Sequence, residues 1–108
     1  MLTVTVENVG ETAILHCAGR VVRGDETTLL CVASRHWERP LIIDLERVES
    51  IDAAGIGALI ALQAAGIYVR LVNPSNSVRE ILRVTQVDSV LEITSPPPNS
   101  PASIQAVA

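Results

Sequence analysis

The first twenty residues alternate between apolar and polar positions in the way that β-strands do. Leu2 to Val6 places Leu and Val on one side and Thr on the other, so one face of this strand is expected to be buried. After a turn at Asn8 to Gly10, Thr12 to Ala18 is almost continuously apolar, which predicts a strand covered on both faces. We expect the two strands to form a hairpin, with the second strand ending at Gly19.

A helix is predicted to follow the hairpin. Asp25 is a residue type that commonly caps the N-terminus of a helix. Leu29, Ala33 and Trp37 then recur at helical spacing and define the side expected to face the core, with Trp37 as a large core residue. Pro40 is expected to end the helix, because a proline disfavours helical geometry in the residue before it.

Strand and helix patterns continue to alternate beyond the first helix. Leu41 to Leu45 is a short apolar run that predicts a buried strand, and Arg47 to Ile51 is predicted to be a loop. Asp52 is expected to cap a second helix that runs from Ala53 to about Ala65. Gly66 would end this helix, since glycine readily takes the left-handed conformation found at helix C-termini.

The next part of the sequence predicts a third helix between two strands. Tyr68 to Val72 is predicted to be a strand, the helix begins at Ser75 or Asn76, and Leu91 to Ile93 is a short final strand or edge segment. The complete order is typical of an α/β fold in which about three helices pack on a four- to five-stranded mixed sheet.

The composition changes abruptly at Ser95. The fourteen residues from this point onward contain four prolines and no charged side chain. Prolines at this density are incompatible with a helix or a strand ladder. We therefore predict one folded domain over residues 1–94 and a flexible Pro/Ser-rich tail over residues 95–108.

Charge and composition favour a protein partner over nucleic acid. The chain has 108 residues and a net charge of -4, from 8 basic and 12 acidic residues. The basic residues form no run or stripe, and the aromatic residues are limited to Trp37 and Tyr68. The basic patch and the stacking side chains of a nucleic-acid-binding protein are therefore missing from the sequence.

The residues that could carry chemistry form no catalytic or metal-binding pattern. His16 lies in a strand predicted to be buried, and neither it nor His36 has the spacing of a metal-ligand pair. Cys17 and Cys31 lie singly in apolar patterns, as small core residues do. We therefore expect a non-enzymatic protein that uses no cofactor and no metal.

The sequence predicts a cytoplasmic protein that does not insert into a membrane. Its N-terminus lacks the basic and apolar regions of a signal peptide. The longest uncharged run, Ala53 to Val69, is interrupted by three glycines and a glutamine. It is also shorter than the roughly 20 apolar residues that a membrane-spanning helix needs.

The segment from Leu41 to Gly57, LIIDLERVESIDAAGIG, carries a recognisable combination of motifs. A strand ends in an apolar-Asp-apolar triplet, Ile43-Asp44-Leu45, and a helix opens with Asp52-Ala53-Ala54-Gly55-Ile56. This order resembles the STAS domain family, in particular the bacterial anti-sigma-factor antagonists, whose helix opens with Asp-Ser-Ser-Gly and an apolar residue. Weaker matches extend the resemblance over about residues 2 to 94.

The resemblance implies a partner-switching regulator that has lost its phosphorylation site. In the antagonists, an anti-sigma factor that is also a serine kinase phosphorylates the second serine of the motif, and this breaks the complex. Ala54 stands at that position here, and Ala53 stands where the other serine would be. Ser50 is the nearest substitute acceptor, although a loop serine that bonds its own backbone is the favoured interpretation.

We expect the partner to be an anti-sigma factor or a serine kinase that docks at the start of the second helix. The residues predicted to bind it are Ser50, Asp52, Ala53, Ala54, Gly55 and Ile56. Two of them have a structural alternative, because Asp52 would also serve as a helix cap and Gly55 would also allow close packing on the sheet.

Two further alternatives stay open at the level of sequence. The second helix is apolar nearly all round, so one side could contact the partner or form a homodimer. STAS-like domains also serve as cytoplasmic accessory subunits of lipid-transport ABC systems, which is the alternative function for this chain.

Overall fold

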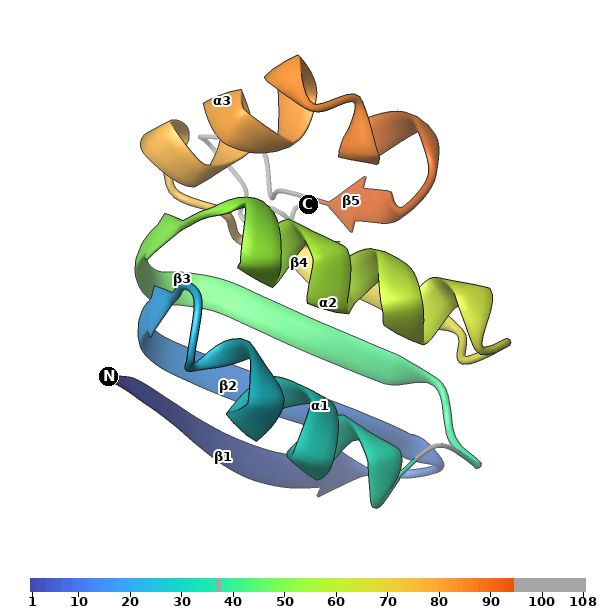
Figure 1. The fold of residues 1–108 in the computed structure, drawn as a ribbon. Coiled ribbons are helices and arrows are strands. Elements are labelled where there is room, and N and C mark those ends of the chain that lie inside the picture. Colours follow the sequence, from blue (N-terminus) through green and yellow to red (C-terminus); the bar gives the residue numbers. More distant parts are fainter. Residues whose placement is uncertain (37, 95–108) are drawn as a thin grey trace, which may run out of the picture.

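Strands and helices follow one another in the order that the sequence patterns predict (Figure 1). The computed structural model describes residues 1–36 and 38–94. The elements in chain order are β1 (Leu2–Val9), β2 (Thr12–Val21), α1 (Glu26–Ser34), β3 (Leu41–Ile51), α2 (Ala53–Ala64), β4 (Val69–Val72), α3 (Asn76–Val84), the 3-10 helix η1 (Val87–Ser89) and β5 (Glu92–Thr94). The predicted α/β fold with a mixed sheet is confirmed.

The strands form one mixed sheet in the order β1-β2-β3-β4-β5. β1 and β2 form the predicted antiparallel hairpin, with Leu2 opposite Gly19 and Val9 opposite Thr12. β2, β3, β4 and β5 run parallel to one another. A helix lies in each of the connections between them, as parallel pairing requires a crossover.

The helices pack on one face of the sheet (Figure 1). In β2, the inward residues Ala13 and Leu15 are fully buried, whereas their neighbours Ile14 and His16 are only half-buried. The prediction that this strand is covered on both faces is therefore wrong. We call the opposite face the outer face; residues 1–36 and 38–94 place no helix over it.

Aliphatic side chains from the sheet and the helices make up the core between the two layers. This composition matches a sequence in which aromatic residues are only 2% of the total. The largest fully buried side chains are Leu15, Leu29, Leu41, Ile43, Leu45, Leu59, Leu71, Leu82, Val21, Val48, Val69 and Val78. Leu and Val side chains suit the thin space between a sheet and helices.

The two central strands are longer than predicted. β3 runs through Ile51, so the expected loop from Arg47 to Ile51 is instead strand, and β2 continues past Gly19 to Val21. Two register shifts occur where these strands pair, and such irregularities break the alternation that marks a strand in sequence. Gly19 does not end the strand; it has a φ of 108° and packs closely against the backbone of Met1.

α1 begins where it was predicted and ends earlier. Asp25 occupies the N-cap position, but in the described part of the chain its side chain accepts no capping hydrogen bond. Leu29 and Ala33 face the core as expected. The helix ends at Ser34, so Pro40 does not end it. Trp37 and the tail predicted for residues 95–108 lie outside the described residues.

The two cysteines have different environments. Cys17 is buried in β2, and burial raises the pKa of its thiol to about 12. Cys31 is exposed on α1, because Leu29 and Ala33 occupy the buried side of that helix. The prediction of a core position is therefore right for Cys17 and wrong for Cys31.

Candidate functional site

Asp52 organises the start of α2. Its Oδ1 accepts hydrogen bonds from the backbone N–H groups of Ala54, at 3.0 Å, and Gly55, at 3.1 Å. Its Oδ2 accepts a third from the N–H of Arg23, at 3.0 Å, in the loop between β2 and α1. The N–H groups of Arg23, Gly55 and Ala54 lower the pKa of this carboxyl. The predicted capping role is confirmed.

Gly55 holds the helix start close to the sheet. A Cβ at this position would overlap the carbonyl oxygen of Val21 and lie 2.8 Å from Cγ1 of Ile51. Close packing therefore explains this glycine. Gly57 is different, because in the described part of the chain an added Cβ would meet no atom within 4 Å. Gly57 leaves an open surface one turn into the helix.

Only part of the predicted partner-binding set is accessible. Ala53 is exposed and Ala54 is half-buried, whereas Gly55 and Ile56 face the core. Ser50 is half-buried within β3, where its backbone lies opposite Arg20 of β2. Ser50 is therefore a strand residue and not the loop residue that the sequence suggested.

α2 presents a surface without charge along its length. Its buried side consists of Gly55, Ile56, Ala58, Leu59 and Leu62. The exposed side, which we call the α2 surface, consists of Ala53, Gly57, Ile60, Ala61, Gln63 and Ala64. Ile60 lies one turn after the buried Ile56, yet its side chain is 38% exposed.

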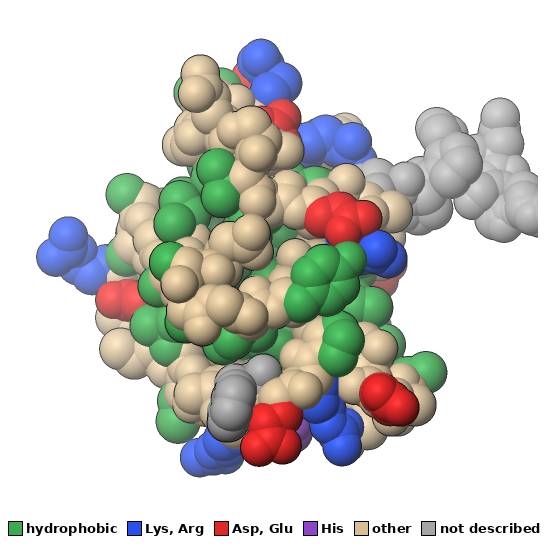
Figure 2. All heavy atoms as spheres, turned by 90° about the vertical axis from the view of Figure 1, so that its right-hand side faces the viewer, with side chains coloured by type: hydrophobic (Ala, Val, Ile, Leu, Met, Phe, Trp, Pro, Cys, Tyr) green, Lys and Arg blue, Asp and Glu red, His purple; other side chains and the backbone are tan. Residues whose placement is uncertain are grey.

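Figure 2 views the molecule from the end at which α2 finishes. Hydrophobic side chains gather on the helix side and in the middle of this view, and most charged side chains lie nearer its edges. The absence of charged residues from α2 itself is a property of its sequence, AAGIGALIALQA. Such a surface suits contact with another apolar protein surface.

A second cluster, which the sequence did not indicate, lies on the outer face. Nδ1 of His16 donates to Oδ2 of Asp44 at 2.8 Å, and Nε2 donates to Oε1 of Glu7, also at 2.8 Å. The bonds to Glu7 and then Asp44 raise the pKa of His16. Both ring nitrogens donate only when the ring is protonated. The side chain of His16 thus connects β1, β2 and β3.

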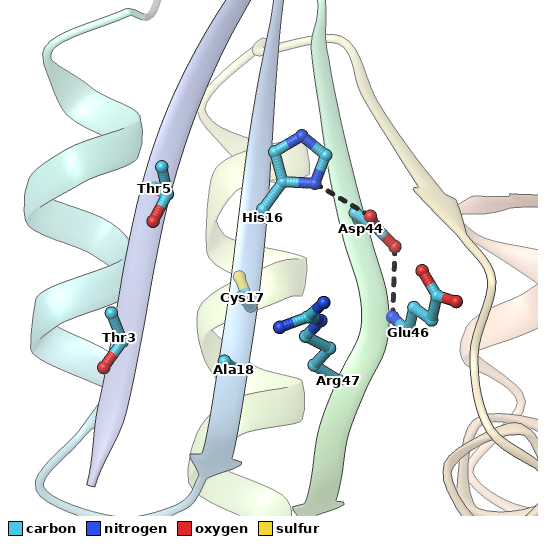
Figure 3. A pocket seen from close by; sticks show the side chains of 8 residues that line it. All are labelled: Thr3, Thr5, His16, Cys17, Ala18, Asp44, Glu46 and Arg47. Atoms are coloured by element: carbon cyan, nitrogen blue, oxygen red, sulfur yellow. Dashed lines mark hydrogen bonds and ion pairs between the residues drawn. The ribbon is translucent and has the colours of Figure 1, made fainter.

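The predicted buried position of His16 is wrong. Its side chain is 41% exposed, because it points to the face that lies away from the helices. Asp44 Oδ1 also accepts from the backbone N–H of Glu46, at 3.0 Å (Figure 3), and from Nδ2 of Asn73, at 3.4 Å. In the sequence, the signal for this cluster was that Glu7, His16 and Asp44 each occupy an outward position of a strand. Their proximity could be recognised only once the pairing of the three strands was known.

Two open hollows lie on either side of His16 and Asp44. The polar hollow, of about 430 Å³, is lined in addition by Thr3, Thr5, Cys17, Ala18, Glu46 and Arg47 (Figure 3). The apolar hollow, of about 440 Å³, is lined in addition by Ile14, Ile42, Val72, Asn73 and Thr94. His16 and Asp44 form the ridge between them, since both hollows include these two residues.

Within residues 1–36 and 38–94, no three His, Cys, Asp or Glu side chains form a group that could hold a metal ion. The helices in that part of the chain are all too short or too polar to cross a membrane.

Comparison with solved structures shows where else this fold occurs. The chain is similar to an anti-sigma factor antagonist from Mycobacterium paratuberculosis, at 19% identity and a TM-score of 0.79 over 92% of this chain and 89% of that one. It is also similar to the anti-sigma factor antagonist SpoIIAA in its unphosphorylated form, at 18% identity and a TM-score of 0.70 over 90% of each chain. At these identities the likeness shows the fold.

The phosphorylated form of SpoIIAA from Bacillus is similar as well, at 18% identity and a TM-score of 0.64 over 90% of this chain and 94% of that one. No curated protein matches the sequence. The model of the STAS domain family, however, matches residues 3–97, which include every strand and helix described above except the first residue of β1, Leu2. The chain therefore belongs to the STAS domain family.

Proposed function

We propose that this STAS domain is a non-enzymatic, cytoplasmic anti-sigma factor antagonist in a partner-switching pathway. It docks an anti-sigma factor or serine kinase at the start of α2, and phosphate at position 54 does not control this contact. The observation that carries the proposal is the form of the helix start. There Ala53 is exposed and Ala54 is half-buried, on a helix that has no charged residue.

The backbone at this helix start is ready for docking. The carboxylate of Asp52 occupies the N–H groups of Ala54 and Gly55, so no backbone donor at these two positions has to be stripped of water when a partner arrives. Two further positions of the α2 surface, Gly57 and Ala61, are small, which lets another protein backbone approach closely. The α2 surface therefore suits a protein partner better than a charged ligand.

Alanine at position 54 keeps the domain in the state that an unphosphorylated antagonist would have. A phosphoserine there would add nearly two negative charges at a helix N-terminus, which the helix dipole tolerates but an apolar interface does not. Ser50 is a poor substitute acceptor. It is half-buried inside a β-strand and paired with Arg20, whereas a kinase needs an accessible segment.

The proposal predicts opposite results for two substitutions at the same position. Ala54→Asp should abolish capture of the anti-sigma factor or kinase from the source cells while leaving the midpoint of urea unfolding nearly unchanged, because the added charge lies at the favourable end of the helix dipole. Ala54→Ser is the matched control and should bind like the wild type when the extract is depleted of ATP, so that the serine stays unphosphorylated. Affinity capture with mass spectrometry, alongside urea titrations, measures both properties.

The control variant also tests the regulatory part of the proposal. If the captured partner is a serine kinase, purified Ala54→Ser should accept phosphate from it and then be released, whereas the wild-type chain should not be phosphorylated. Equal binding of Ala54→Asp and wild type would show that α2 does not begin the docking site. Capture of a permease and an ATPase instead would favour the ABC-transport alternative.

A further inference from the structure

The polar hollow on the outer face has a regular construction across three strands. Ala18 of β2 pairs with Thr3 of β1 on one side and with Arg47 of β3 on the other. The neighbouring row across the same strands consists of Thr5, His16 and Asp44. The small side chain of Ala18 therefore forms a floor between longer side chains, and the backbones at Thr3 and Arg47 are two strand spacings apart, about 10 Å.

A bulge in β3 brings Arg47 to this face of the sheet. His16 pairs with Asp44 and Ala18 pairs with Arg47, so one residue of β2, Cys17, lies opposite two residues of β3. In an unbroken strand, position 47 would face the helices, because position 44 faces outward and side chains alternate. With the extra residue, Arg47 is exposed and lines the hollow. Bulges are rare between parallel strands, and they often redirect a side chain next to a functional site.

The guanidinium of Arg47 is available to a ligand. Within residues 1–36 and 38–94 it has no hydrogen-bond or ion-pair partner. Figure 3 shows it turned toward β2, whereas the side chain of Glu46 extends to the other side of β3. The other charged side chains of the lining, His16 and Asp44, are bonded to each other at 2.8 Å. Arg47 therefore supplies the charge that the hollow presents to a ligand.

Two threonines add polar groups at the opposite wall. Thr3 and Thr5 are exposed on β1, and their hydroxyls have no hydrogen-bond partner in the part of the chain that the structure describes. A hydroxyl both donates and accepts, so each can bond an oxygen atom of a ligand. The planar N–H donors of Arg47 match the geometry of a carboxylate or a phosphate group. The hollow thus combines one charged donor with two neutral hydroxyls around a small apolar floor.

The size of the polar hollow suits a small molecule. Its volume of about 430 Å³ is within the range of roughly 300–1,000 Å³ that is usual for small-molecule sites. The apolar hollow on the other side of His16 is similar in volume, but no arginine lines it. Recognition of an anionic group on this part of the outer face therefore belongs to the polar hollow.

We propose that the polar hollow binds a small molecule through a carboxylate or phosphate group that pairs with Arg47. Other oxygen atoms of the ligand bond to Thr3 and Thr5, and its body lies on Ala18. The site is on the face of the sheet away from α2, so it does not depend on the proposed docking of a protein partner there.

Titration of the full-length chain with three probes, followed by NMR at constant pH and ionic strength, tests the proposal. The probes are inorganic phosphate, glycerol phosphate and succinate. At least one of them should shift the signals of Thr3, Thr5 and Ala18 in a saturable manner, while the signal of Ala61 on the α2 surface stays unchanged. Tighter binding of the two phosphates would assign a phosphate group to the ligand, and tighter binding of succinate would assign a carboxylate.

A pair of charge variants tests the role of Arg47. Arg47→Gln should weaken binding of the preferred probe by about tenfold or more, because it removes the charge-assisted hydrogen bonds. Arg83→Gln is the matched control, since it removes the same charge from α3 on the other side of the sheet, and it should bind like wild type. Equal affinities of wild type and Arg47→Gln, or equal losses in both variants, would overturn the proposal.

The variant Ala18→Val tests the floor separately from the charge. Valine suits a strand position, so the core methyl signals of Leu15 and Val48 should persist and show that the fold is intact. The added methyl groups fill the floor, and binding of the preferred probe should be lost. Unchanged binding by Ala18→Val, or no saturable shift of the wild type with any of the probes, would show that the hollow is not a ligand site.

Discussion

At the scale of single residues, the two glycines near the start of α2 have opposite roles. Gly55 lies against Val21 and Ile51, where there is no room for a Cβ, whereas Gly57 faces open space. Sequence alone treats them alike, because both interrupt the same apolar helix pattern. The distinction arises from the residues on β2 and β3 that α2 meets.

Alanine substitutions should therefore change stability in opposite directions. Gly55→Ala is expected to lower the free energy of unfolding by roughly 1–3 kcal/mol through overpacking. Gly57→Ala should raise it by roughly 0.5–1 kcal/mol, because alanine loses less backbone entropy in a helix. Urea titrations of the two variants measure this. Changes of the same sign would mean that Gly55 is not packed as described.

His16 predicts a specific dependence of stability on pH. Its pKa in the folded state is raised by the bonds to Glu7 and Asp44. The stabilisation is therefore fully present below about pH 6.5, the ordinary pKa of histidine, and is lost as the pH rises through the raised folded-state pKa. The effect should be under about 1 kcal/mol, because the side chains of His16 and Glu7 are substantially exposed.

Comparison with the variant His16→Asn isolates this effect. Free energies of unfolding measured by urea titration at a series of pH values should decline more steeply with rising pH in wild type than in the variant. Parallel profiles would show that the bonds from His16 to Glu7 and Asp44 do not stabilise the folded protein.

At the scale of elements, the beginnings of α2 and α3 are set by local capping. Asp52 accepts from two N–H groups of α2, and Ser75 accepts from the N–H of Val78 in α3 at 3.3 Å. Both starts were predictable, because a capping side chain and its helix are adjacent in sequence. Strand ends were less predictable, as β3 shows, since pairing with β2 extends it to Ile51.

The two caps should differ in importance. Ser75→Ala is expected to cost about 1 kcal/mol, the usual value for one capping hydrogen bond. Asp52→Ala should lower the Tm more than Ser75→Ala does. It also removes the hydrogen bond from the N–H of Arg23, which connects the loop before α1 to the start of α2. Asp52→Asn keeps a capping oxygen and should fall between wild type and Asp52→Ala. Thermal unfolding followed by circular dichroism checks this order.

At the scale of the whole molecule, the two thiols should report on different motions. Cys31 is exposed on α1, whereas Cys17 is buried in β2 and has a pKa of about 12. Cys31 should therefore react at once with a thiol reagent under native conditions. Cys17 should react only when the domain opens, because the thiolate is the reactive form and is disfavoured by burial.

Mass spectrometry of the timed reaction distinguishes the two events. One label should appear rapidly and a second slowly, with the slow step accelerating in urea in proportion to global unfolding. The variant Cys31→Ser should retain only the slow step. Rapid double labelling of the wild type would show that β2 is accessible without unfolding.

The sequence by itself determined the order of strands and helices, the hairpin, the start of α2 and its match to the STAS motif. These features depend on residues close together in the chain, where periodicity and capping act. Only the tertiary structure decided which face of the sheet stays open and that His16 lies between Glu7 and Asp44. It also decided why Gly55 and Gly57 differ. The physical reason is that these contacts join residues distant in sequence, and strand pairing and one-sided helix packing bring them together.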